Sequence, residues 1–212
     1  DPLQLPISGR DLMLAVDISG SMELDDMTVD GRAVSRLGAV KAVAGEFIDR
    51  RVGDRLGLIL FGDQAYLQTP LTFDRETVRT QLNEAAIGLA GKSTAIGDAI
   101  GMAVKRLRNQ PQENRVLVLL TDGNNTAGEV APLKAAELAG RERIRIYTIG
   151  IGAEQMIVQD IFGPQRVANT ALDERTLKAV AEATGGRGAH RDHPVAGGRT
   201  ESRIYPPAVH FQ

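Results

Sequence analysis

The chain of 212 residues is long enough for one large domain, and its 42% hydrophobic and 25% charged residues are typical of a folded globular protein. Its formal net charge of -2 gives no electrostatic basis for binding nucleic acid, so we expect no nucleic-acid partner. The absence of cysteine excludes disulfides, thiolate metal sites and thiol catalysis. No apolar run approaches the roughly 20 residues that a membrane-spanning helix needs, so we expect no direct membrane insertion by this segment.

The sequence divides into three parts. Residues 1–9 are predicted to be a linker, residues 10–186 a folded domain, and residues 187–212 an irregular tail rich in Gly, Pro, Arg and His. The chain begins at Asp1 without a signal-peptide pattern, and we expect it to be a piece of a longer protein.

Continuous apolar runs predict the strands. A strand that is buried on both faces shows no alternation, which is typical of a parallel sheet covered by helices, and the runs of this kind are residues 12–16, 56–61, 116–120 and 144–151. The short turn at Gly62 and Asp63 then predicts a hairpin that adds residues 65–69 as an antiparallel edge strand.

Segments with helical spacing lie between the runs. Ser35 is a predicted N-cap for a helix through Ile48, Pro132 is a predicted first-turn residue, and Asp173 is a predicted cap of the last helix. Further helices are predicted over residues 74–86 and 96–107, whereas residues 154–171 predict a loop or short hairpin. The fold class is therefore α/β, a doubly wound, mostly parallel open sheet with helices on both faces and one antiparallel edge strand.

Three polar segments are predicted to meet at one edge of this sheet, namely residues 17–21, 92–94 and 121–123. Each segment alone is typical of turns and helix caps. Together they offer two carboxylates and three hydroxyls, and hard divalent cations such as Mg²⁺ prefer all-oxygen ligands. The sequence thus predicts a cation site formed by Asp17, Ser19, Ser21, Thr94 and Asp122.

These motifs resemble a known family. Asp-Ile-Ser-Gly-Ser-Met at residues 17–22, Thr94 in Ser-Thr-Ala-Ile-Gly-Asp-Ala and Asp122 in Leu-Leu-Thr-Asp-Gly resemble the metal-ion-dependent adhesion site of von Willebrand factor type A domains. All five ligand positions of that site are filled, and the resemblance covers residues 10–186. Residues 61–70, Phe-Gly-Asp-Gln-Ala-Tyr-Leu-Gln-Thr-Pro, further resemble the bacterial aerotolerance-related (Bat) subgroup.

The resemblance implies a Rossmann-like fold and a non-enzymatic interaction module. Ser19, Ser21 and Thr94 would coordinate Mg²⁺, Mn²⁺ or Ca²⁺ directly, while Asp17 and Asp122 would act wholly or partly through water. The open position of the cation would accept a Glu or Asp carboxylate from a protein partner. Because members of the Bat subgroup are tethered by segments outside the domain, we expect a full-length protein anchored at the bacterial inner membrane, within a membrane-associated complex.

Two alternative functions come from other classes. Residues 88–94, Gly-Leu-Ala-Gly-Lys-Ser-Thr, are similar to a phosphate-binding loop of nucleotide-binding proteins, but Ala86 stands where that motif needs its first Gly. The other alternative is a Mg²⁺-dependent phosphotransfer enzyme or hydrolase that uses Asp17, although no His or Lys is predicted beside it as an acid or base.

Two further clusters of polar residues are interpreted as solvated. The acidic loop, which contains Glu23, Asp25, Asp26 and Asp30, would connect the metal motif to the next helix, with a turn at Asp30-Gly31. It could also screen partners by charge, since it follows the site directly. The run His190-Arg191-Asp192-His193 has metal-like spacing but lies in the predicted tail without a further ligand.

Overall fold

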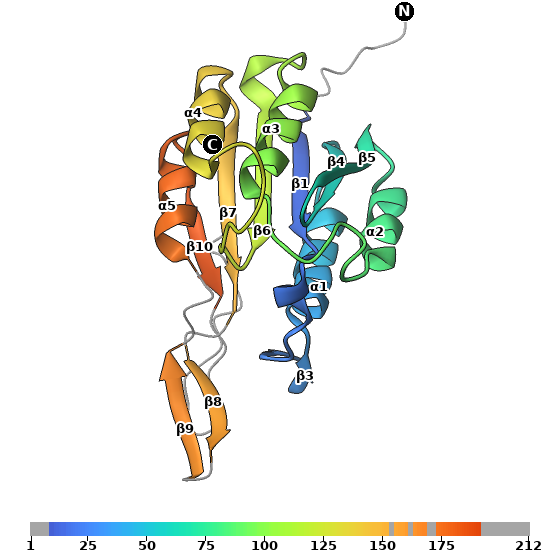
Figure 1. Cartoon of the computed structure of the whole chain (residues 1–212). Helices are drawn as coiled ribbons and strands as arrows, with labels where there is room; N and C mark the ends of the chain where they lie inside the picture. The colour runs from blue at the N-terminus through green and yellow to red at the C-terminus, as the bar shows by residue number, and fades with distance from the viewer. Residues whose placement is uncertain (1–8, 153–154, 161–162, 169–172, 192–212) are drawn as a thin grey trace, which may run out of the picture.

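The computed structural model describes residues 9–152, 155–160, 163–168 and 173–191. Its centre is a six-stranded sheet in the order β10-β7-β6-β1-β4-β5 (Figure 1). All neighbouring strands are parallel except β5, which pairs antiparallel to β4 at one edge. The strands of this sheet are β1 (Asp11–Asp17), β4 (Arg55–Phe61), β5 (Ala65–Thr72), β6 (Arg115–Thr121), β7 (Arg145–Ile151) and β10 (Gly188–Arg191).

Helices cover both faces of the sheet, as the apolar runs predicted. Alternate residues of β1 point to opposite layers, so that Leu12 and Leu14 pack in one core and Met13 and Ala15 in the other. The first core contains α1 (Arg36–Asp49) and α2 (Arg75–Glu84), and the second contains α3 (Ile96–Leu107), α4 (Pro132–Arg141) and α5 (Glu174–Glu182). The predicted doubly wound α/β fold with one antiparallel edge strand is confirmed.

The predicted helix starts are also confirmed. The Ser35 hydroxyl accepts the N–H of Gly38 at 3.1 Å, and Asp173 accepts the N–H of Thr176 at 3.1 Å. Both side chains satisfy amides that the first turn of a helix leaves without a partner. Pro132 occupies the first turn of α4, where its missing N–H costs nothing.

The predicted irregular tail from residue 187 is wrong for its first residues. Gly188–Arg191 form β10, a parallel edge strand on β7, and the N–H of Thr148 bonds to the carbonyl of Arg187 at 3.2 Å. A short edge strand is held by backbone bonds along one side, so it can form without the apolar alternation whose absence argued against a strand. Residues 192–212 lie outside the described part of the chain.

Two small hairpins lie outside the main sheet. The acidic loop folds into β2 (Met27–Val29) and β3 (Arg32–Val34), and their turn has positive φ at Asp30 and Gly31, 51° and 76°, as a two-residue hairpin turn requires. In the segment predicted as a loop or short hairpin, β8 (Gln155–Asp160) pairs antiparallel with β9 (Gly163–Ala168).

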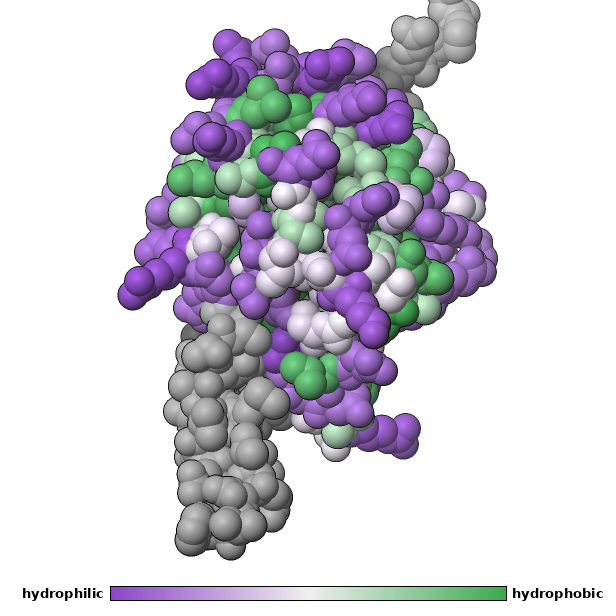
Figure 2. Space-filling view, in the orientation of Figure 1, coloured by the Kyte–Doolittle hydropathy of each residue, from purple (hydrophilic) through white to green (hydrophobic). Residues whose placement is uncertain are grey.

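The surface is that of an ordinary globular domain. On the face shown in Figure 2, hydrophobic residues form small separate groups among hydrophilic ones. Within the described ranges, none of the helices combines the length and the hydropathy needed to cross a membrane.

Candidate metal site

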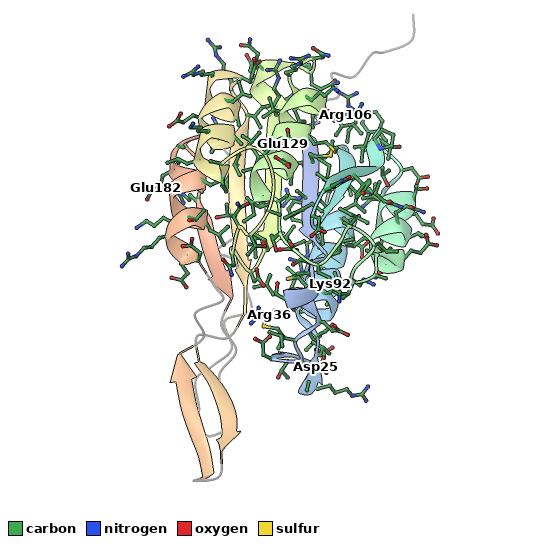
Figure 3. The ribbon with its side chains drawn as sticks, in the orientation of Figure 1. Asp25, Arg36, Lys92, Arg106, Glu129 and Glu182 are labelled. Carbon is green, nitrogen blue, oxygen red and sulfur yellow. The ribbon has the colours of Figure 1, made fainter. Side chains whose placement is uncertain are left out.

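The candidate site lies where β1 ends. This strand runs between β4 and β6, and the chain reaches those two neighbours over opposite faces of the sheet, through α1 on one face and α3 on the other. The loops after β1 and β6 therefore separate and leave room for a ligand beyond the carboxyl ends of the strands. Figure 3 shows Arg36, Lys92 and Asp25 at this end of the sheet, while Arg106 lies toward the opposite end.

The turn after β1 holds the first three predicted ligands together. Asp17 is fully buried, and its Oδ1 accepts the N–H of Ser19 at 2.8 Å. Its Oδ2 accepts the hydroxyl of Thr121, the last residue of β6, at 2.6 Å. The hydroxyl oxygens of Ser19 and Ser21 lie 3.1 Å apart. One carboxylate and two hydroxyls thus converge within five residues of chain.

Thr94 arrives on a separate loop that packs against this turn. The N–H of Gly20 bonds to the carbonyl of Lys92 at 3.0 Å, which brings the loop alongside the Ser19–Ser21 turn. Thr94 itself is 3% exposed, and its N–H bonds to the hydroxyl of Thr126 at 2.9 Å, in the segment that follows β6. The described bonds attach Thr94 to the site through its backbone, and they leave its hydroxyl oxygen available.

Gly62 allows this loop to come close. A Cβ atom at Gly62 would lie 2.6 Å from the carbonyl oxygen of Ala90, which is nearer than side-chain atoms pack. The carbonyl of Gly62 also accepts the N–H of Ala95 at 2.8 Å, directly after Thr94. The glycine after β4 therefore fixes the path of the loop that carries Thr94.

Asp122 completes the set from the end of β6. It is fully buried, and its Oδ2 accepts Nη1 of Arg36 at 3.0 Å, while the N–H of Asn124 lies 3.5 Å from its Oδ1. Arg36 is the first residue of α1 and is itself fully buried. On its other side it bonds to Asp26 of the acidic loop, from Nη2 to Oδ2 at 2.6 Å and from Nε to both oxygens at 3.0 Å.

Burial and neighbouring charges shift the pKa values of Asp17 and Arg36. The pKa of Asp17 is raised from 3.8 to about 7, because burial, together with the charge of Asp122, outweighs the bonds from Ser19 and Thr121 that lower it. Burial alone would lower the pKa of Arg36, but the bonds and charges of Asp26 and Asp122 outweigh burial and raise it, so the guanidinium stays charged. Of the ion pairs among described residues, none includes Asp17.

The structure therefore brings the five predicted residues to one edge of the sheet. Four of them, Asp17, Ser19, Thr94 and Asp122, are buried, and Ser21 is half-buried. Across the described ranges, no group of three His, Cys, Asp or Glu side chains could hold a metal, so a cation would depend on these hydroxyls. Two carboxylates with three hydroxyls are donors that suit a hard divalent cation.

Arg36 and Asp26 belong to the surroundings of the site although the sequence motifs do not include them. The acidic loop was interpreted as solvated, but the Asp26 side chain is only 11% exposed because Arg36 holds it. A signal was present in the sequence, since Arg36 directly follows the Ser35 cap. A cation in the first turn of a helix meets the positive end of the helix dipole and needs a local reason to be there.

The phosphate-loop reading of residues 88–94 finds no support in the geometry. The segment follows the helix α2 instead of a strand. The amides that would cradle a phosphate are bonded within the chain: Gly88 to the carbonyl of Ile18, Gly91 to that of Gly88, and Ser93 to the carboxylate of Asp63. The other metal-like run is divided, because His190 and Arg191 lie in β10 while Asp192 and His193 fall outside the described residues.

Comparisons with known proteins agree with the fold and identify the family. The von Willebrand factor type A domain matches residues 11–185 of the chain. An uncharacterized protein of Borreliella burgdorferi is 32% identical over 148 residues, which are 70% of this chain and 42% of that protein, so the chain spans less than half of its length.

Solved structures also match. An aerotolerance-related membrane protein from Bacteroides fragilis has a TM-score of 0.72 and 27% identity, over 87% of this chain and 92% of that one. Proximal thread matrix protein 1 from the mussel byssus, solved with a zinc-occupied metal-ion-dependent adhesion site, has a TM-score of 0.61 and 17% identity, over 87% of this chain and 44% of that one. The latter likeness concerns the fold alone. The chain belongs to the von Willebrand factor type A domain family, whose members include adhesion and protein-interaction modules.

Proposed function

We propose that the domain binds one divalent cation on Asp17, Ser19, Ser21, Thr94 and Asp122, and through it a carboxylate of a protein partner. The observation that carries this proposal is Asp17. Its carboxylate is fully buried, its pKa is raised to about 7 by burial, and it takes part in none of the ion pairs among described residues. A buried carboxylate without a counter-ion is costly, and a bound cation would remove that cost.

The neighbouring groups fit that cation. Ser19, Ser21 and Thr94 offer neutral hydroxyl oxygens, which we assign to direct coordination, and Asp17 and Asp122 offer charge directly or through water. Mg²⁺ is the metal we expect, with Mn²⁺ and Ca²⁺ as substitutes, because all five ligands are oxygen donors. The bound ion supplies a Lewis-acidic open position that attracts an anionic oxygen. Since three of the five ligands are neutral, the ion keeps part of its charge for that external ligand.

The partner is therefore expected to be a protein that presents a Glu or Asp side chain. The Bacteroides fragilis relative is described as a membrane protein, and we extend this to the present chain as part of the proposal: the domain belongs to a longer protein that is anchored at the bacterial inner membrane and acts in a complex there. A metal-dependent hydrolase is a weaker candidate. Beside Asp17 the described side-chain contacts are those of Ser19, Thr121 and, through charge, Asp122, and no His or Lys is among them to act as a general acid or base.

Isothermal titration calorimetry with MgCl₂ tests the metal proposal. The wild-type domain is expected to bind one ion, and Asp17→Ala and Asp122→Ala are expected to lose measurable binding while far-ultraviolet circular dichroism shows that they stay folded. Glu137→Ala is the matched control, because it removes an exposed carboxylate from α4, away from the site. Unchanged affinity in both site variants would refute the assignment of these residues.

The partner proposal needs a separate experiment. The wild-type domain and Asp122→Ala are immobilised and exposed to membrane extracts of the source bacterium, once with Mg²⁺ and once with chelator. We expect a set of proteins retained only by the wild type with Mg²⁺. If every retained protein is indifferent to both chelator and substitution, the metal bridge is wrong even where the metal itself binds.

A further inference from the structure

A single buried guanidinium connects the candidate metal site to the acidic loop. Arg36 Nη1 lies 3.0 Å from Oδ2 of Asp122, and the same side chain bonds to Asp26 through Nε and Nη2 at 2.6–3.0 Å. The side chains of Arg36 and Asp122 are fully buried, and that of Asp26 is 11% exposed. The acidic loop and a predicted metal ligand therefore share one positive charge.

The guanidinium is enclosed as well as paired. It lies against the backbone of Gly152, directly after β7, where a Cβ atom would be 3.4 Å from Nη2 and 3.5 Å from Cζ. The φ of Gly152 is 151°, so a larger residue there would have a strained backbone, although its Cβ would only reach ordinary van der Waals contact with Arg36. Arg36 is thus fully buried, with Gly152 on one side of its guanidinium.

This arrangement has a clear electrostatic consequence. Asp122 cannot give its full charge to a cation while Oδ2 is bonded to Arg36, and the positive guanidinium beside it repels any further positive charge. Asp26 acts in the opposite direction, because its carboxylate neutralises the guanidinium from the far side. In low-dielectric surroundings such charges act strongly on one another.

We propose that Arg36 is an internal counter-ion of the metal site, which stabilises Asp122 in the metal-free protein and weakens cation binding, and that Asp26 of the acidic loop tunes this effect. The proposal rests on the proposed function, since it assumes that a divalent cation binds next to Asp122. Arg36 is a positioning residue in this account: it bonds to Oδ2 of Asp122, whereas Oδ1 has only the N–H of Asn124 at 3.5 Å among the described bonds. The acidic loop is then a regulator of metal affinity, and a partner that displaces Asp26 from Arg36 would loosen the cation.

The charge mechanism makes two variants move metal affinity in opposite directions. Arg36→Gln removes the competing positive charge and is expected to tighten Mg²⁺ binding roughly 5- to 50-fold, the usual size of a coupling between two sites. Asp26→Asn leaves the guanidinium to Asp122 alone and is expected to weaken Mg²⁺ binding by a similar factor. A role for Arg36 in packing alone would make both variants weaken binding or leave it unchanged.

Matched controls lie close by in the sequence. Arg32→Gln on β3 and Asp25→Asn in the acidic loop make the same charge changes at exposed positions. Both are expected to leave the dissociation constant for Mg²⁺ within about twofold of the wild type, because solvent screens exposed charges. Titration calorimetry with MgCl₂ alone measures all five proteins under identical conditions.

Thermal unfolding gives a second readout that does not depend on a partner. By linkage, the variant that binds Mg²⁺ more tightly must show the larger rise in melting temperature at a fixed Mg²⁺ concentration. We expect that rise to be greatest in Arg36→Gln and smallest in Asp26→Asn. If Arg36→Gln does not fold, Asp26→Asn and Asp25→Asn still keep the proposal open to refutation, because Mg²⁺ affinity in Asp26→Asn that equals the affinity of Asp25→Asn would contradict it.

The outcomes separate this inference from the proposed function. If the wild type binds no Mg²⁺, the proposed function fails and this inference fails with it. If the wild type binds and Arg36→Gln does not bind more tightly, or Asp26→Asn does not bind more weakly, the counter-ion role of Arg36 is refuted while the metal site stands.

Discussion

The substitution Asp17→Asn is predicted to stabilise the metal-free domain while abolishing metal binding. Asn keeps an oxygen that can accept the N–H of Ser19, which lies 2.8 Å from Oδ1, and it removes the buried charge. Burial raises the pKa of Asp17 from 3.8 to about 7. At about 1.4 kcal/mol for each pKa unit, keeping this group ionised in the folded protein at pH 8 costs up to about 4 kcal/mol of unfolding free energy.

The sign of the pH dependence follows from the same shift. In the unfolded chain Asp17 loses its proton near pH 3.8, whereas in the folded metal-free domain it keeps the proton until about pH 7. Between these values the unfolded state binds fewer protons, so the contribution of Asp17 to stability falls as pH rises. The stability of Asp17→Asn relative to the wild type should therefore rise from about pH 4 to about pH 7 and then level off.

Urea unfolding of both proteins in chelator, at pH 4.5, 6 and 8, measures this difference. Because every other titrating group is shared, subtracting the two free energies of unfolding isolates residue 17. Saturating Mg²⁺ at pH 8 should stabilise the wild type and leave Asp17→Asn unaffected. A free-energy difference that stays constant across the three pH values would refute the reasoning that Asp17 is a buried, uncompensated carboxyl.

Three further predictions concern single positions. Ser21→Ala should weaken Mg²⁺ binding at least about tenfold in calorimetry. The stability of the metal-free domain should change little, because Ser21 is half-buried and its hydroxyl contacts only Ser19 among the described bonds. An affinity equal to the wild type would remove Ser21 from the ligand set. Gly62→Ala should lower the melting temperature and also weaken Mg²⁺ binding, because a Cβ would lie 2.6 Å from the carbonyl of Ala90 and shift the loop that carries Thr94. Loss of stability with unchanged affinity would show that the path of this loop does not determine metal binding. Ser35→Ala should lower the free energy of unfolding in urea by about 1 kcal/mol, because the Ser35 hydroxyl caps α1 at the N–H of Gly38. An unchanged free energy of unfolding would contradict a stabilising role for this cap.

Much of the fold could be predicted because local signals agree with the tertiary structure. The run Leu12 to Val16 is apolar at every position, and β1 is buried on both faces, so composition alone indicates its central place. Ser35 and Asp173 predict helix starts because a free amide needs an acceptor wherever a helix begins. The order of the motifs along the chain then predicts which loops share an edge of the sheet.

The elements that could not be predicted depend on partners far away in sequence. β10 exists because the backbone of Gly188–Arg191 meets the free edge of β7, and nothing in the four residues themselves indicates that edge. The position of Arg36 directly after a helix cap indicates that the cation needs a local partner, but it does not indicate which residue that partner is. The burial of Arg36 is explained only by Asp122, which lies 86 residues away, and by Asp26 in the folded acidic loop.

The central claim, a divalent cation held by these five residues, is tested most directly by crystals of the domain soaked in MnCl₂. An anomalous difference map recorded at the manganese edge locates the ion without assumptions about its ligands. We predict one peak at the carboxyl end of β1, in contact with the hydroxyls of Ser19, Ser21 and Thr94 and beside Asp17 and Asp122. A map with no peak there, or with its only peak elsewhere in the domain, would contradict the account.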